Sequence, residues 1–360
     1  MEWNTRKFSW PTSKSTNYTA PLFTHLAFFC ILLGVCILGA CGNAGSPGSS
    51  QEKAPELVIW TYDSFNSEWG PGPGLAKQFL EETGIAIRWV NHQDAGSMLS
   101  RLLLEGSDAQ GDIILGLDQN MASRALESGL LAAYTPEGFD NILPELLIDP
   151  TNRLIPFDYS YFAVVYNSEE LPNPPRNLED LASGEYRNSL ILLDPRTSSP
   201  GLGFFAWTRE AYGSSWPNYW QRLRPSILTI AESWSSGYGL FTAGEAPMVL
   251  SYTTSPGYHL EYENTEIYRA AIFEDGHPIQ IELAGLLSTA ANREQAERFL
   301  DFMLNPSFQS MIPLTNWMYP ATPIELPDSF WINPKSDTPL YPMPPTEAEL
   351  NEWSILMSQR

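Results

Sequence analysis

Short β-rich runs alternate with helix-like segments, and this alternation restricts the possible folds more than any other feature of the sequence. In the first third of the chain, strands and helices are expected in turn over 57–61, 75–83, 85–90, 98–104, 112–117 and 121–131. Such alternation is typical of a doubly wound, mostly parallel sheet with helices on its faces. We therefore predict an α/β fold.

The later part of the chain repeats the pattern. Further strands are expected over 161–166, 190–193 and 248–251, and further helices over 200–211 and 295–304. Thr346 and Glu349 form a capping-box pattern before a last helix. The simplest arrangement is two α/β lobes that face each other across a cleft, with the chain crossing between them near 156–161 and 279–284. The predicted lobes are 56–157 with 284–360, and 158–283.

The N-terminal segment has the pattern of a targeting sequence. Basic residues outnumber acidic ones over the first 21 positions, and an apolar stretch then runs from Leu22 to Leu38. The residues from Leu38 to Cys41 resemble the lipobox of bacterial lipoprotein signal peptides, in which the cysteine is lipidated and becomes the new N-terminus. We predict a signal peptide over 1–40 and a flexible tether over 41–55. The alternative is an uncleaved membrane anchor.

Lipidation of Cys41 would place the protein at the outer face of the cytoplasmic membrane or in the periplasm. The net charge of −22 argues against a nucleic-acid partner, because no excess of basic residues offsets phosphate repulsion. All three cysteines lie at or before position 41, so the body after the anchor has no disulfide and no cysteine nucleophile. The histidines show no metal-ligand spacing, and we predict no metal site.

Polar side chains follow the first three predicted strands. In a doubly wound sheet, ligands bind beyond the carboxyl ends of the strands. The segments 62–64, 92–94 and 118–120 come directly after those strands. We therefore expect them to line one cleft.

Three kinds of residue converge at the predicted strand ends. Aromatic rings are supplied by Tyr62, Trp69, Trp234, Tyr238, Tyr252, Tyr258, Trp317 and Tyr319, and carboxylates by Asp63, Asp94, Asp118 and Asp158. Rings and carboxylates together suit a flat organic cation. The hydroxyls and glycines of 197–203, at a helix start, suit an anion. The combination indicates a cationic heterocycle with a hydroxyl or phosphate tail. The alternative is that single rings fill a core and that 197–199 only caps its helix.

A series of sequence blocks resembles bacterial thiamine-binding proteins of ABC importers, which belong to the type II periplasmic-binding-protein family. The blocks are WTYDSF at 60–65, EWGPGP at 68–73, GLD at 116–118, PFDY at 156–159, DPRTSSPGLG at 194–203, WSSGYGLF at 234–241, YTTSPGYH at 252–259 and NWMYP at 316–320. They occur in the family order and span roughly Leu57 to Pro323. Together the blocks are specific evidence for this family, although each block alone would be weak evidence.

The resemblance implies a two-lobed protein that closes over thiamine, thiamine phosphate or thiamine diphosphate and delivers it to a permease, with no catalysis and no cofactor. The family's ligand-contact positions fall on Tyr62, Trp69, Asp94, Ser198, Trp234, Tyr252, Tyr258 and Trp317. By the family's pattern, Tyr258 and neighbouring rings sandwich the heterocycles. Asp94 would hold the aminopyrimidine end, and Ser198 would face the phosphate or hydroxyethyl end.

Two other functions compete with this one. Thiaminase I, an enzyme on a related fold, cleaves thiamine with a cysteine nucleophile, and the predicted mature body has no such cysteine. A carrier of another organic cation, such as a polyamine, would also use rings and acids. It would leave the helix start at 197–203 without a role.

Overall fold

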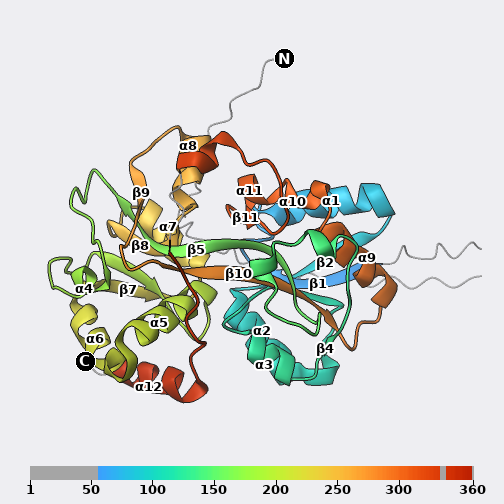
Figure 1. Cartoon of the computed structure of the whole chain (residues 1–360), viewed down its shortest axis with the longest axis horizontal. Helices are drawn as coiled ribbons and strands as arrows, with labels where there is room; N and C mark the ends of the chain where they lie inside the picture. Colours follow the sequence, from blue (N-terminus) through green and yellow to red (C-terminus); the bar gives the residue numbers. More distant parts are fainter. Residues whose placement is uncertain (1–55, 333–337, 359–360) are drawn as a thin grey trace, which may run out of the picture. The chain divides into compact units, whose positions relative to one another are not determined.

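The computed structural model describes residues 56–332 and 338–358 (Figure 1). The predicted signal peptide, the tether over 41–55 and Cys41 lie outside the described residues. Within the described ranges, no helix combines the length and the apolar character needed to cross a bilayer.

Strands and helices alternate along the described chain. The strands are β1 (Glu56–Tyr62), β2 (Ala86–His92), β3 (Ile113–Asp118), β4 (Leu131–Ala132), β5 (Ile155–Asn167), β6 (Leu190–Leu193), β7 (Ile227–Ala231), β8 (Met248–Tyr252), β9 (Tyr268–Ala271), β10 (His277–Leu287), β11 (Tyr319–Pro320) and β12 (Pro339–Leu340). The helices are α1 (Pro71–Thr83), α2 (Ala95–Glu105), α3 (Ala122–Glu127), α4 (Leu178–Leu181), α5 (Ser199–Tyr212), α6 (Trp216–Leu223), α7 (Trp234–Thr242), α8 (Ser255–Glu263), α9 (Arg293–Met303), α10 (Pro306–Gln309), α11 (Ile312–Thr315) and α12 (Glu347–Ser358).

Two groups of parallel strands are joined by two long antiparallel strands. The order through the sheet is β2-β1-β3-β10-β5-β8-β6-β7. Strand β1 is parallel to β2 and β3, and β6 is parallel to β7 and β8. Strands β5 and β10 run antiparallel beside each other, as Figure 1 shows. The chain leaves one group along β5 and returns along β10, so these two strands point in opposite directions.

We call β1–β3 with α1–α3 the first lobe and β6–β8 with α5–α7 the second lobe. The predicted mostly parallel sheet is found within each lobe, whereas the join between the lobes is antiparallel. Both predicted crossings lie inside β5 and β10. The residue boundaries of the two lobes stay a prediction.

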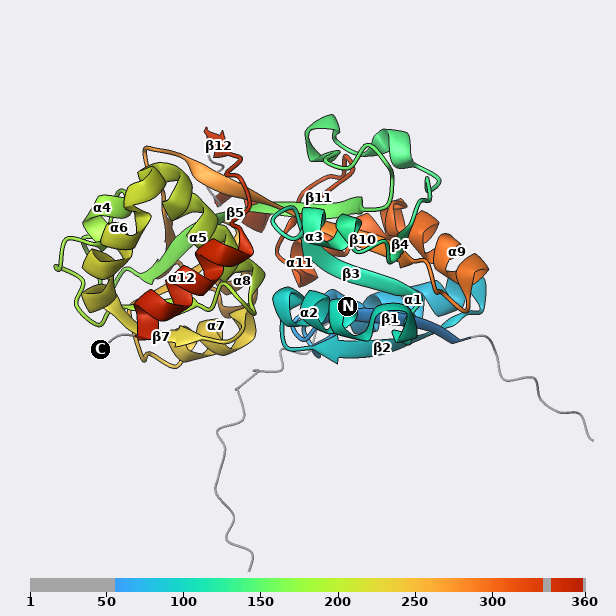
Figure 2. The same cartoon turned by 90° about the horizontal axis from the view of Figure 1, so that it is seen from below.

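The C-terminal helix α12 packs on the second lobe, against α6. Helix α6 buries Trp216, Tyr219, Trp220 and Leu223 along one face, at helical spacing. Trp353 of α12 is buried and meets the Trp220 ring edge-on, with 5.5 Å between ring centroids. Figure 2 shows α12 lying along the second-lobe helices. The packing therefore ties α12 to the second lobe.

The predicted capping box before α12 is present. The Thr346 amide donates to Glu349 Oε2 at 2.7 Å, and the Glu349 amide donates to Thr346 Oγ1 at 3.2 Å. Glu349 also pairs with Arg209 of α5 at 3.3 Å. The cap therefore also helps to fix α12 on the second lobe.

Candidate functional site

The carboxylate of Asp94 lies at the starts of three helices. Asp94 follows β2 and caps α2, where its Oδ1 accepts from the Ala95 amide at 2.7 Å. The same oxygen accepts from the Ser199 amide of α5 at 3.2 Å, and Oδ2 accepts from the Trp234 amide of α7 at 3.0 Å. Helix N-termini carry partial positive charge, so they favour a carboxylate here. Asp94 thereby connects the first lobe to the second.

Asp94 is buried, with 6% of its surface exposed. Burial raises its pKa to about 6, although the three amide hydrogen bonds act in the opposite direction. Ser198, the N-cap residue of α5, is also buried, and its hydroxyl favours the charged form of Asp94. The family resemblance implies that Asp94 and Ser198 hold different ends of a ligand, and this stays a prediction. In the structure the two side chains lie near each other, because α2 and α5 begin close together.

Rings from both lobes surround this junction. The Trp234 indole stacks on Tyr238, with centroids 4.9 Å apart and planes 21° apart. Trp69, from the loop between β1 and α1, approaches Trp234 to 6.0 Å. Trp234 Nε1 donates to Ser251 Oγ at 2.9 Å, which fixes the orientation of the indole. Trp69 and Trp234 are both half-buried, so part of each ring stays open to a ligand.

Three buried carboxyl groups, those of Asp118, Asp158 and Glu282, form a centre that we call the acidic centre. Each is at most 4% exposed. Asp158 and Glu282 stand opposite each other on β5 and β10. Among the described residues, no salt bridge joins any of these three carboxyls to a lysine or arginine. The acidic centre therefore has no paired basic side chain in the described chain.

Burial raises the pKa of every carboxyl in the acidic centre. It raises the pKa of Asp118 to about 7, and the charge of Asp94 adds to this shift. It raises the pKa of Glu282 well above its ordinary value, and the charge of Asp158 adds to the effect. The pKa of Asp158 is raised for the same reason. A cation placed here would stabilise the charged forms.

A chain of hydrogen bonds links tyrosines of the two lobes through β10. The Tyr62 hydroxyl at the end of β1 donates to Glu282 Oε2 at 2.7 Å. Gln280 Nε2 donates to Glu282 Oε1 at 3.0 Å, and the Tyr252 hydroxyl at the end of β8 donates to Gln280 Oε1 at 2.8 Å. Two predicted site residues, Tyr62 and Tyr252, therefore meet at the acidic centre.

Trp317 and Tyr258 form a separate pair of rings. Their centroids are 5.7 Å apart with perpendicular planes, and Trp317 stacks on Phe330 at 5.9 Å. Trp317 has a φ of +57°, a left-handed conformation that is strained for a bulky residue. The preceding Asn316 donates from Nδ2 to Asp158 Oδ2 at 2.7 Å. At this strained turn, the Asn316 side chain contacts the acidic centre, and the Trp317 indole contacts the rings of Tyr258 and Phe330.

Three polar residues of this region were not predicted from the sequence as site residues: Gln280, Glu282 and Asn316. Glu282 is an acid inside an otherwise apolar strand, and this pattern could have singled it out. Asn316 lies in the NWMYP block, from which the family resemblance singled out Trp317 but not Asn316.

Two of the three histidines of the described chain have hydrogen-bond partners, whereas the Nε2 of His92 is buried without one. His277 Nδ1 lies 2.7 Å from the Phe162 carbonyl oxygen, and His259 Nε2 lies 2.8 Å from the Tyr238 hydroxyl. In the ranges that the structure describes, no cluster of three or more potential metal-ligating side chains occurs.

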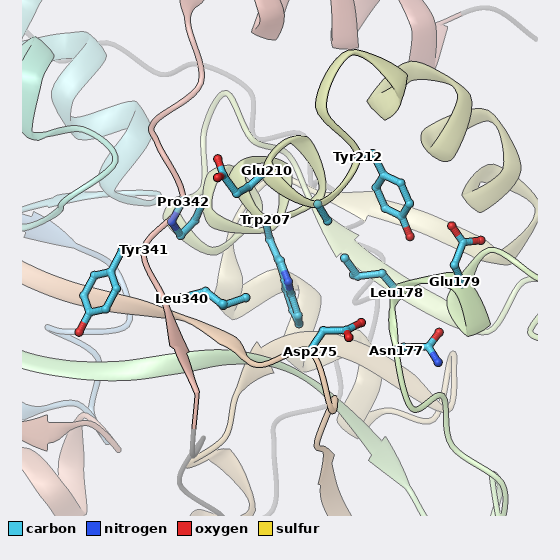
Figure 3. A pocket seen from close by; sticks show the side chains of 11 residues that line it. Asn177, Leu178, Glu179, Trp207, Glu210, Tyr212, Asp275, Leu340, Tyr341 and Pro342 are labelled. Atoms are coloured by element: carbon cyan, nitrogen blue, oxygen red, sulfur yellow. The ribbon is translucent and has the colours of Figure 1, made fainter.

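A pocket of about 590 Å³ lies beside α4 and α5 (Figure 3). It is lined by Asn177, Leu178, Glu179, Trp207, Glu210, Ala211, Tyr212, Asp275, Leu340, Tyr341 and Pro342. None of the predicted site residues is among them. Glu179 is neutralised by Arg222, with a shortest contact of 2.6 Å.

Comparisons with known proteins give consistent matches. Residues 110–337 match the family described as bacterial extracellular solute-binding protein. A thiamine-binding periplasmic protein of Brucella abortus is 45% identical over 315 residues, which cover 84% of this chain and 92% of the relative. One of Escherichia coli is 39% identical over 318 residues, covering 85% and 94%. The solved structure of a periplasmic thiamin binding protein, 39% identical, matches with a TM-score of 0.82 over 86% of this chain and 98% of that one.

Proposed function

The chain belongs to the bacterial extracellular solute-binding proteins, in the group of thiamine-binding periplasmic proteins, and on this premise we propose that it binds thiamine or a thiamine phosphate ester. We further propose that it delivers this ligand to the permease of an ABC transporter. The protein acts by binding and release, so no bond of the ligand is made or broken.

The acidic centre is the observation that carries the proposal. Buried carboxyls are costly when no cation balances them. Thiamine brings a fixed positive charge on its thiazolium ring and an amino group that donates hydrogen bonds. Bound beside Asp118 and Glu282, it would supply the missing counter-charge.

Aromatic side chains at the lobe junction suit the two flat rings of thiamine. Ring faces attract a desolvated cation with about 0.5–2 kcal/mol each. We propose Tyr62, Trp69, Trp234, Tyr252, Tyr258 and Trp317 as the ring contacts, with Asp94 and Ser198 at one end of the ligand. Tyr62 and Trp234 come from different lobes, so a ligand between them would favour the closed form.

Direct contacts between the lobes would hold that closed form. Ser235 Oγ of α7 donates to Asp63 Oδ1 at 2.8 Å, and Gln93 Nε2 donates to Glu232 Oε2 at 2.7 Å. A permease that recognises the closed form would then receive the protein only with its ligand in place.

We also propose that the protein works outside the cytoplasm, held to the membrane by lipid on Cys41. The lipobox-like sequence supports this anchor. Mass spectrometry of the native protein tests it, because acylation adds the mass of the fatty chains to a peptide that begins at Cys41. An unmodified peptide that spans residues 40 and 41 would contradict it.

Titration of the purified protein with thiamine, followed by tryptophan fluorescence, tests the binding function. We expect saturable quenching with one site per chain, because Trp69 and Trp234 lie at the lobe junction. Spermidine is the control for a general preference for organic cations. Saturation by spermidine but not by thiamine would refute the proposal.

A further inference from the structure

Helix α8 carries a row of three polar side chains that face the rings of the second lobe. Ser255, His259 and Glu263 follow one another at intervals of four residues, which places them on one face of the helix. We call these three residues the α8 row. Ser255 and His259 are buried, whereas the Glu263 side chain is 39% exposed. The row therefore runs from the interior to the surface.

The middle member of the α8 row, His259, is held between a carboxylate and a phenol. Its Nδ1 lies 2.7 Å from Glu263 Oε2, and its Nε2 lies 2.8 Å from the Tyr238 hydroxyl. A carboxylate can only accept a hydrogen bond, so this pairing assigns the imidazole hydrogen to Nδ1. Nε2 is then an acceptor, and the Tyr238 hydroxyl donates to it. Glu263 thereby sets the tautomer that holds Tyr238.

The Tyr238 ring connects His259 to a proposed ligand contact. It stacks on the Trp234 indole at 4.9 Å, and its plane lies 22° from that of the His259 imidazole at 5.9 Å. Tyr268 packs against the same imidazole, with centroids 4.0 Å apart. Ring contacts therefore continue from Trp234 at the lobe junction into the interior of the second lobe.

Ser255 supports the same indole by a second route. Trp234 Nε1 donates to Ser251 Oγ at 2.9 Å, and Ser251 Oγ lies 2.8 Å from Ser255 Oγ. The α8 row thus acts on the face of the indole through Tyr238 and on its N–H through Ser251. A half-buried ring keeps one orientation only when such neighbours fix it.

From these contacts we infer that His259 is a positioning residue for ligand binding, because it holds the Tyr238 hydroxyl and so fixes the ring on which Trp234 stacks. The inference rests on the proposed function, in which Trp234 contacts thiamine. His259 is fully buried, so it acts on a ligand through these rings. Without His259, the buried Tyr238 hydroxyl would lack this acceptor, and the ring would have to shift to find another.

Thiamine titrations of the full protein and its variants test the inference. Tyr238→Phe removes the hydroxyl and keeps the ring, and His259→Phe removes the acceptor and keeps a flat ring. Each is expected to raise the dissociation constant for thiamine about fivefold, as the loss of one hydrogen bond would. The double variant lacks both partners, so it should bind no more weakly than the weaker single variant. His259→Gln keeps an amide oxygen that can accept from Tyr238, and it should return the dissociation constant to within about twofold of wild type.

His277→Phe is the matched control. His277 is equally buried and also makes two hydrogen bonds, with the Phe162 carbonyl oxygen at 2.7 Å and the Phe273 amide at 2.8 Å. Its ring packs on Trp207 and Phe273 and not on the stack behind Trp234. The substitution should lower the free energy of unfolding and leave the dissociation constant for thiamine within about twofold of wild type.

Four results would overturn the inference: wild-type affinity in Tyr238→Phe, multiplied effects in the double variant, no recovery in His259→Gln, or a His277→Phe variant as weak as His259→Phe. Tyr238→Phe removes the same hydrogen bond and decides the outcome if the His259 variants do not fold. Each of these results leaves the proposed function standing as long as the wild type binds thiamine. Failure of the wild type to bind thiamine would refute the proposed function itself.

Discussion

The buried carboxyl of Asp118 predicts an unusual dependence of stability on pH. Its pKa is about 7 in the folded chain, against an ordinary value of 3.8. Between these values, the folded protein holds the proton while the unfolded chain has lost it. Raising the pH through this window therefore favours unfolding, and stability is retained at the acidic end.

The magnitude follows from the pKa difference of about 3. Each unit corresponds to 1.36 kcal/mol, so the full effect above pH 7 is about 4 kcal/mol. Between pH 5 and pH 8, about 3 kcal/mol of this should be lost as the pH rises. The raised pKa values of Asp94, Asp158 and Glu282 act in the same direction.

Urea denaturation at pH 5, 6, 7 and 8, without ligand, measures this effect. The free energy of unfolding should fall across the series. Asp118→Asn removes one titrating group, so its series should fall less steeply. An unfolding free energy that rises with pH, or an Asp118→Asn series as steep as wild type, would refute the reasoning.

The ring contacts, the buried carboxyls and the packing of α12 each give one further prediction. Trp234→Ala and Tyr258→Ala should each weaken thiamine binding by ~1–3 kcal/mol through lost ring contacts, and a titration that finds wild-type affinity would remove that ring from the site. When thiamine binds at pH 6.5, the protein should release protons, because a bound cation lowers the pKa of the Asp94 and Asp118 carboxyls. Calorimetry in two buffers of different ionisation enthalpy would detect this, and equal heats in both would contradict it. Trp353→Ala should lower the unfolding free energy by ~3–5 kcal/mol, because it empties the core under α12, and leave thiamine affinity unchanged; weaker binding would mean that α12 supports the site.

The sequence predicted six of the twelve strands in the described chain, each from a short run dominated by apolar residues, and it did not predict β7 or the long β10 as strands. Strand β6 was predicted with the bounds that it has, and β1 and β8 differ by one residue at one or both ends. The start of α1 was predicted four residues too late. Its first turn contains Pro71 and Pro73, which look like a loop in sequence, although proline suits the first turn of a helix.

Helix α3 was predicted to be longer than it is. It ends at Glu127, because Gly129 has a φ of +71° and the chain turns there into β4. Strand β5, by contrast, begins six residues before its predicted start. Its first residues include Pro156 and the ionisable Asp158, which interrupt the apolar run from which a strand would be predicted.

The site was predictable as a set of residue types but not as an arrangement. Strand ends identified Tyr62, Asp94 and Tyr252. The position of Asp94 beside the amides of Ser199 and Trp234 depends on where α5 and α7 start in space, which no local pattern encodes. The acidic centre depends on the register that places Glu282 opposite Asp158 across two strands far apart in the chain.

A crystal structure of the protein grown with thiamine tests the central claim most directly. We predict the ligand between the lobes, with its rings against Tyr62 and Trp234 and its positive charge beside the acidic centre. Thiamine found instead in the pocket beside Trp207, or a lobe junction that stays closed and empty at saturating thiamine, would contradict the account.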